Sequence, residues 1–105
     1  MSPDSSNPLT TIRQQIAELD ALTRQTCQDL NTVAGTERVA KWKSRTVALI
    51  TSAVGQEDGQ AFAHIQPGPF FTNDLLEEFT DLVECYRTPL VRLADKLARS
   101  SSPGN

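Results

Sequence analysis

Residues 76–97 read LEEFTDLVECYRTPLVRLADKL, and their large apolar side chains recur at alternating steps of three and four. This spacing places those side chains on one stripe of a single α-helix, forming a seam that packs against other helical surface. The seam consists of Leu76, Phe79, Val83, Tyr86, Leu90, Leu93 and Leu97. The sequence therefore predicts an all-α protein whose third helix makes its main contacts with other helices.

Pro89 lies inside this third helix. Proline removes a main-chain hydrogen bond and its ring clashes with the carbonyl of Cys85, which costs about 3 kcal/mol unless the helix bends. Because the apolar repeat continues past Pro89 in the same phase, we predict a kinked helix. The alternative is a separate helix that Thr88 caps and Pro89 begins. At the start of the third helix, the N-terminal cap is either Thr72 or Asp74.

Two further helices precede the third. Asn7 is a strong N-terminal cap because proline follows it at the first helical position. Gly35 can adopt a left-handed conformation and end this first helix. Thr36 then caps a second helix that runs to Val54, before Gly55. Since only Gly35 and Thr36 separate the two helices, they should form an antiparallel hairpin.

The apolar stripes of these two helices define the expected core. The first stripe is Leu9, Ile12, Ile16, Leu19, Leu22, Leu30 and Val33, and the second is Val39, Trp42, Thr46, Leu49, Ile50 and Ala53. Thr23 and Thr26 interrupt the first stripe, and each hydroxyl can bond to the carbonyl one turn earlier. They are either a weakly packed part of the stripe or polar residues that fix the register of helix packing by disfavouring wrong pairings. Cys27 should be a small buried hydrophobe, and Cys85, on the polar side of its helix, should be accessible.

The segment from 56 to 73 is predicted to be an ordered loop rich in Pro and Phe. It is too apolar for a flexible spacer because it holds Phe62, Ile65, Phe70 and Phe71. Residues 61–65 can form one helical turn, and the residues at 66–69, Gln-Pro-Gly-Pro, have the composition of a β-turn. We expect this segment to lie across one end of the bundle as a plug. Connections of this length are often functional.

The chain thus forms one small bundle of three main helices over residues 7–99. The ends, 1–6 and 100–105, are rich in Ser, Pro and Asn and should be disordered. With 105 residues, 38% apolar and 6% aromatic, the core is small, and a partner can supply part of the stability.

Charge and composition exclude several classes of protein. A net charge of −3 and a pI near 5.0 argue against a dedicated nucleic-acid binder. No run approaches the roughly 18 apolar residues of a transmembrane helix, and the polar N-terminus does not resemble a signal peptide. The two cysteines are not part of a Cys-x-x-Cys pair. We therefore expect a cytoplasmic protein with free thiols and no membrane contact.

The sequence lacks the parts of an enzyme or of a cofactor site. The single histidine, His64, cannot form a multi-histidine metal site, and the Glu-x-x-His repeats of di-iron bundles are absent. Neither a phosphate-binding loop nor a Gly-x-Ser-x-Gly elbow is present. The third helix does carry an acidic stripe followed by a basic one, comprising Asp74, Glu77, Asp81 and Glu84, then Arg92, Lys96 and Arg99. This stripe predicts a solvated face that complements the helix dipole, and two antiparallel copies would match acid to base.

The second helix carries a basic rim around Trp42. The rim consists of Arg38, Lys41, Lys43 and Arg45. Cations around an aromatic ring can hold single-stranded nucleic acid by stacking and phosphate contact. The interpretation we favour is that Trp42 anchors the core and that the cationic stems cover its edges.

Trp42 on a helix, Gly55 at its end and Phe62 shortly after form a pattern that covers Val39 to Ile65. This pattern resembles uncharacterised helical regions of prokaryotic proteins, which often precede effector domains, including some linked to phage defence. The resemblance implies a sensing or assembly role and no catalytic residue. We expect no effector domain within these 105 residues.

The leading hypothesis is a non-enzymatic interaction module that self-associates or docks a protein partner through the third-helix seam. One alternative is a regulatory or adaptor subunit of a neighbouring effector, with Trp42 and the 56–73 segment as the contact surface. The other is a weak nucleic-acid binder that uses the basic rim.

Overall fold

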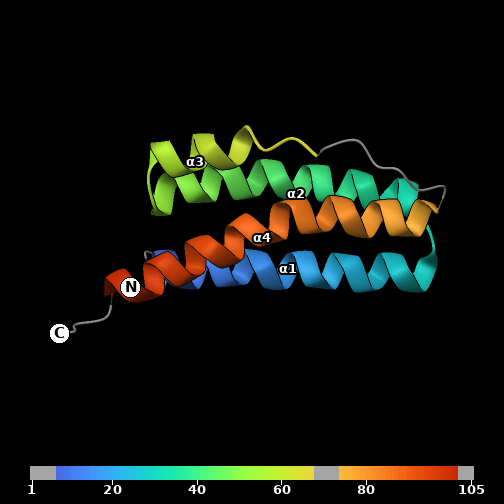
Figure 1. Cartoon of the computed structure of the whole chain (residues 1–105), viewed down its shortest axis with the longest axis horizontal. Helices are drawn as coiled ribbons and strands as arrows, with labels where there is room; N and C mark the ends of the chain where they lie inside the picture. Colours follow the sequence, from blue (N-terminus) through green and yellow to red (C-terminus); the bar gives the residue numbers. More distant parts are fainter. Residues whose placement is uncertain (1–6, 68–73, 102–105) are drawn as a thin grey trace.

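The protein is described by a computed structural model that covers residues 7–67 and 74–101, with side chains through residue 99. Its helices are α1 (Pro8–Asp29), α2 (Thr32–Ala53), α3 (Gln56–Ala63) and α4 (Leu75–Ser101), and these residues contain no strand. The predicted all-α class is confirmed, with four helices in place of three. In Figure 1, α1 and α2 form an antiparallel hairpin, and α4 runs along both of them.

The turn between α1 and α2 lies five residues earlier than predicted. Helix α1 ends at Asp29, Leu30 adopts the left-handed conformation with φ 57°, and Asn31 caps α2 by accepting a hydrogen bond from the Ala34 amide at 3.1 Å. Gly35 is therefore inside α2 and does not end a helix. It is buried because the helices approach closely there: a Cβ at Gly35 would lie 2.5 Å from the Thr26 hydroxyl.

The segment after α2 contains a helix, so the prediction of a loop with one helical turn is wrong for its first half. Helix α3 folds back against the last turns of α2 and does not cross the end of the bundle (Figure 1). Its residue Phe62 is 4% exposed, and the apolar burial that Phe62 supplies stabilises this short helix. Phe70 and Phe71, and the second half of the predicted turn at 66–69, lie outside the described residues.

Helix α4 is continuous through Pro89, so the alternative of two separate helices is wrong. Its axis changes direction along its length, as Figure 1 shows, in agreement with the predicted kink. Asp74 caps the helix by accepting hydrogen bonds from the amides of Leu76 at 2.9 Å and Glu77 at 3.3 Å. The alternative cap, Thr72, lies outside the described residues, as do the predicted tail at 1–6 and residues 102–105 of the tail predicted at 100–105. Helix α4 continues to Ser101, so the prediction of a disordered tail is wrong for residues 100 and 101.

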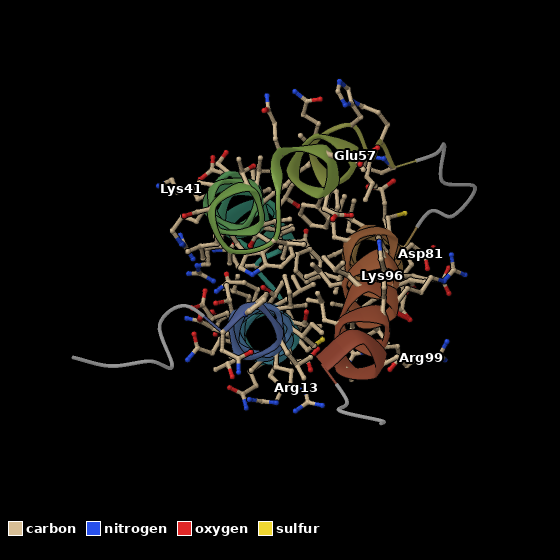
Figure 2. The ribbon with its side chains drawn as sticks, turned by 90° about the vertical axis from the view of Figure 1, so that its left-hand side faces the viewer. Arg13, Lys41, Glu57, Asp81, Lys96 and Arg99 are labelled. Atoms are coloured by element: carbon tan, nitrogen blue, oxygen red, sulfur yellow. The ribbon has the colours of Figure 1, made fainter. Side chains whose placement is uncertain are left out.

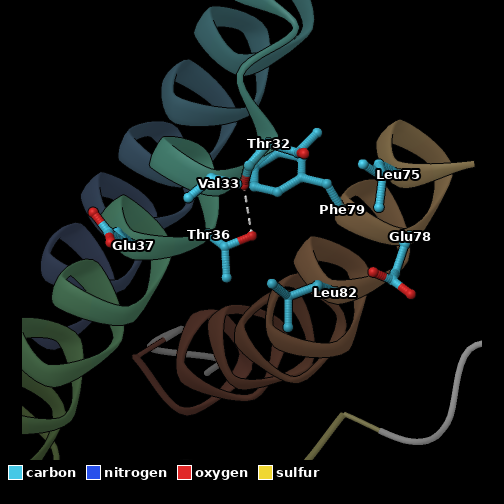
Figure 3. A pocket seen from close by; sticks show the side chains of 8 residues that line it. All are labelled: Thr32, Val33, Thr36, Glu37, Leu75, Glu78, Phe79 and Leu82. Carbon is cyan, nitrogen blue, oxygen red and sulfur yellow. Dashed lines mark hydrogen bonds between the residues drawn. The ribbon is translucent and has the colours of Figure 1, made fainter.

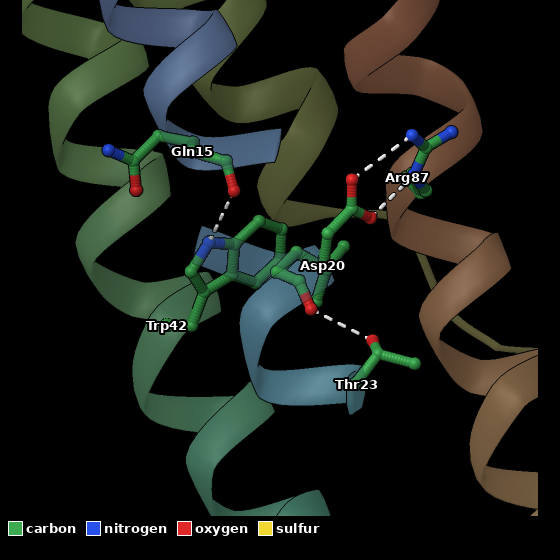
Figure 4. Close-up of polar contacts among 6 residues, drawn as sticks. Gln15, Asp20, Thr23, Trp42 and Arg87 are labelled. Atoms are coloured by element: carbon green, nitrogen blue, oxygen red, sulfur yellow. Dashed lines mark hydrogen bonds and ion pairs between the residues drawn. The ribbon is translucent and has the colours of Figure 1, made fainter. Parts of the chain in front are cut away.

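The core is formed where α1, α2 and α4 meet, with Phe62 of α3 added from one side. Its buried apolar residues are Ile12, Leu19, Val39, Trp42, Ile50, Phe62, Phe79, Val83, Tyr86, Leu90 and Ala94. The hydroxyls of Thr23 and Thr26 bond to the carbonyls of Leu19 and Leu22, as predicted. Figure 4 shows the Thr23 contact.

Several predicted core positions are exposed. Leu30 is 68% exposed and Val33 is 72% exposed, because the early turn leaves both of them at the end of the bundle. Leu49 is 39% exposed. Cys27 is exposed, since its neighbour Thr26 faces the core, and Cys85 is half-buried.

Candidate docking groove between helices α2 and α4

The third-helix seam lies inside the single chain. Phe79, Val83, Tyr86 and Leu90 are between 0% and 7% exposed, and helices α1 and α2 cover them. Leu76, Leu93 and Leu97 are half-buried. The buried side chains have no free surface for a partner while this fold is intact, so a contact surface has to be sought on the flanks of α4.

Helix α4 packs closely on α1 and less closely on α2. Along the second half of α2, helix α3 covers the resulting gap, and the end-on view in Figure 2 shows α3 lying between α2 and α4. The ring of Phe62 reaches both helices, with its centroid 5.9 Å from that of Trp42 and 6.0 Å from that of Tyr86. Along the first half of α2, none of the helices in residues 7–67 and 74–101 covers the gap.

This open half forms a groove of about 480 Å³. Its apolar lining comes from Val33 of α2 and from Leu75, Phe79 and Leu82 of α4, and its polar lining from Thr32, Thr36, Glu37 and Glu78. Figure 3 shows the α2 side chains on one wall, the α4 side chains on the other and the Phe79 ring between them. The Thr36 hydroxyl is satisfied within its own helix, 2.8 Å from the Thr32 carbonyl oxygen. The groove therefore offers a mainly apolar surface.

Exposed apolar side chains extend the groove at the same end of the bundle. Leu75 is 65% exposed and, with Leu30, lines a second hollow beside the groove. The left-handed backbone at Leu30 costs a non-glycine residue about 1 kcal/mol, and its exposed side chain gains little from burial. Glycine or asparagine would suit this position better on grounds of folding alone. Exposed apolar patches are typical of interaction sites, which makes this end of the bundle the candidate contact surface.

The fixed charges on the groove walls are negative. Glu37 lies on the α2 wall and Glu78 on the α4 wall (Figure 3). Within residues 7–67 and 74–99, neither carboxylate forms an ion pair, and the three ion pairs present involve Asp29, Glu18 and Asp20. The positive N-terminal ends of α2 and α4 are capped by Asn31 and Asp74.

The structure does not bring the predicted basic rim together as one surface. Arg38 lies 3.9 Å from Asp29, and Arg45 lies 3.3 Å from Glu18, both acids of α1. Lys43 faces the other side of α2, where its Nζ donates to the Ile65 carbonyl oxygen at 3.0 Å and lies 4.9 Å from the centroid of the Tyr86 ring. Lys41 is exposed. Trp42 is 0% exposed and offers no face for a stacking base.

The predicted charged stripe of α4 is exposed along its length. Figure 2 shows Asp81 and Arg99 pointing away from the bundle, and Lys96 is exposed as well. Arg87, beside this stripe, binds Asp20 of α1 through two hydrogen bonds of 2.8 and 3.2 Å (Figure 4). The Asp20 carboxylate raises the pKa of Arg87, first by hydrogen bonding and then by its charge.

Within 7–67 and 74–99, no cluster of three or more His, Cys, Asp or Glu side chains is placed to hold a metal ion. The Nδ1 atom of His64, just after α3, lies 2.7 Å from the Gln60 carbonyl oxygen of that helix. None of the described helices has a sufficiently long apolar stretch to span a bilayer.

Comparison of the chain with protein-family models, with curated proteins and with solved structures finds no match.

The seam prediction included Phe79 and Leu76, which line the groove and the adjoining hollow. It missed Leu75 and Leu82, which precede the seam positions Leu76 and Val83 by one residue. The sequence does show them as two additional apolar residues beside the seven seam positions, which makes the apolar face of this helix wider than the seam alone.

Proposed function

We propose that this protein is a non-enzymatic helical module that docks a segment of a partner protein in the open half of the α2–α4 groove. The observation that supports it is the apolar groove continuing into the exposed side chains of Leu30, Val33 and Leu75. The third helix of the sequence prediction, α4, remains a contact element, but the contact surface is its flank and not its seam.

The exposed rim favours a protein segment over a small ligand. A small molecule within the groove would leave the side chain of Leu30, which lines the adjoining hollow, in water. A helix or an extended segment would cover it as well and gain about 25 cal/mol for each Å² of apolar surface buried. The groove volume of about 480 Å³ accommodates a few large side chains of such a segment.

Charge disfavours a second copy of the chain as the occupant. Two copies joined groove to groove by a two-fold axis would place Glu37 and Glu78 of one copy near the same acids of the other. Like charges in such a contact cost free energy.

A role as an adaptor subunit fits the same surface, and the partner's identity would define that role. The free thiols of Cys27 and Cys85 are consistent with the cytoplasm that we propose as its location.

Site-specific photo-crosslinking in the native host tests this proposal. A photoreactive phenylalanine analogue replaces Val33 or Leu75 at the groove, and Leu49 serves as an apolar control on a distant part of α2. The groove positions should form one discrete adduct whose crosslinked peptide maps to a single segment of one protein. Excess wild-type protein should compete for this adduct, and the Val33→Ser/Leu75→Ser variant should not. Adducts that are absent, or identical at Val33, Leu75 and Leu49, would contradict the proposal.

A further inference from the structure

The chemistry of the docked segment can be inferred from the covered half of the same groove, and this inference rests on the proposed function. We infer that the segment is a short amphipathic helix with one aromatic anchor side chain and with cationic residues about one turn to either side of it.

Helix α3 shows what the α2–α4 gap accepts. This helix has 8 residues, a length of about 12 Å, and it fills the covered half with one large side chain. That side chain, Phe62, packs edge-on against Trp42, with 80° between the ring planes, and against Tyr86 of α4. A single aromatic residue on a short helix is therefore sufficient to bridge α2 and α4.

The open half repeats this apolar surface two turns earlier along α4. Phe79 lies seven residues before Tyr86, which places it on the same face of the helix about 10 Å away. Phe79 lines the groove together with Leu82 and Leu75. An aromatic anchor in the groove would thus meet the aliphatic side chains of Leu75 and Leu82 and the small part of Phe79, 2% exposed, that faces the groove.

The covered and open halves of the groove carry charges of opposite sign. This difference indicates which charge the docked segment carries on either side of its anchor. In the covered half, the wall residue is Lys43, which binds the Ile65 carbonyl oxygen just beyond the C-terminal end of α3. In the open half, the wall residues are Glu37 and Glu78, on opposite sides of the groove and without ion pairs to described residues. Cationic side chains on both flanks of the anchor would complement these two carboxylates.

Three fluorescein-labelled helical peptides test the inference by fluorescence anisotropy. The first has one phenylalanine with lysines one turn before and after it, the second replaces the lysines by glutamates, and the third replaces the phenylalanine by alanine. The first should bind wild-type protein at least about tenfold more tightly than either of the others, and added salt should weaken it. Glu37→Gln/Glu78→Gln should reduce its affinity about tenfold, whereas Glu57→Gln/Asp95→Asn, which removes two exposed carboxylates elsewhere, should not.

The outcomes separate this inference from the proposed function. If the lysine and glutamate peptides bind equally well, or the two double variants behave alike, the charge assignment is wrong. If none of the peptides binds while Val33 and Leu75 still form the specific adduct in cells, the inferred chemistry is wrong and the docking function stands. If that adduct is also missing, the proposed function fails as well.

Discussion

The indole nitrogen of Trp42 donates a hydrogen bond to the main-chain carbonyl oxygen of Gln15, 3.0 Å away across the α1–α2 interface (Figure 4). The side-chain oxygen of the same Gln15 accepts a hydrogen bond from the Thr46 hydroxyl at 3.1 Å. Trp42 and Thr46 are 0% exposed and Gln15 is 3% exposed. Because unsatisfied polar groups are costly when buried, these two bonds fix how α1 and α2 are aligned along their length.

Replacing Thr46 by valine removes the hydroxyl and keeps the shape of the side chain. The Gln15 side-chain oxygen then loses its buried donor, so the free energy of unfolding should fall by about 1–3 kcal/mol. Urea unfolding followed by circular dichroism measures this change. In the double variant Gln15→Leu/Thr46→Val, the polar group is removed as well, and part of the loss should be recovered. A double variant that is less stable than the sum of the single changes would contradict this account.

Replacing Gly35 by alanine should destabilise the protein even though alanine favours helices. The new Cβ would lie 2.5 Å from the Thr26 hydroxyl and 3.0 Å from the Phe79 ring. Thr26 is 0% exposed and its hydroxyl donates to the Leu22 carbonyl oxygen, so a shift would disturb buried contacts. Overpacking costs about 1–3 kcal/mol, against about 1 kcal/mol gained in helix propensity.

The matched test of this close approach is a double-mutant cycle. In a Thr26→Ala background, space opens for the methyl group, so Gly35→Ala should be neutral or stabilising. Ser44→Ala, on the exposed face of the same helix, should change stability little in either background. An equal cost of Gly35→Ala with and without Thr26 would show that the contact is not the cause.

Replacing Leu90 by alanine tests whether the seam is internal. Leu90 is 0% exposed, so its truncation should cost about 2–5 kcal/mol. Leu75→Ala, at a side chain that is 65% exposed, should stay within about 0.5 kcal/mol of the wild type. Thermal unfolding at several protein concentrations measures both effects. A loss from Leu90→Ala that disappears on dilution would instead indicate a seam buried between copies.

The stability of the protein should fall above about pH 10 because of Tyr86. Burial, followed by the charge of Cys85, raises the pKa of Tyr86 above its ordinary value of 10.0. The folded state therefore keeps the phenolic proton at a pH where the unfolded chain loses it. The stabilising effect is complete below the unfolded pKa and is lost as the pH rises through the folded one. Tyr86→Phe should remove this dependence.

The chain offers a direct readout, since it holds one tyrosine. Ultraviolet difference absorbance of tyrosinate should show ionisation of the native protein at a higher pH than that of the urea-unfolded protein. Ionisation at the same pH in both states would contradict the shift.

Short-range patterns in the sequence predict much of this fold. The three-and-four repeat identifies α4 and its buried side chains, and the caps at Asn7 and Asp74 follow from local chemistry. Gly35 shows the limit of this reasoning, because a glycine that ends a helix and a glycine that lets two helices approach look alike in sequence. The helical hairpin was predicted, yet its turn at Leu30 was not.

Helix α3 and the groove depend on contacts that are distant in sequence. Residues Gln56–Ala63 have no side-chain cap at their N-terminus, so the helix depends on Phe62 packing against Trp42 and Tyr86. The groove exists because α3 covers only half of the gap between α2 and α4. Local periodicity carries no information on that coverage. It does show Glu78, Leu75 and Leu82 beside the seam positions of α4.

The most direct test of the docking groove is methyl NMR of the protein, titrated with a synthetic peptide of the segment that crosslinks to it. We expect the methyl signals of Val33, Leu75 and Leu82 to shift in a saturable manner, while that of Leu49 stays unchanged. Shifts centred on Leu93 and Leu97, with Val33 and Leu75 unaffected, would contradict it.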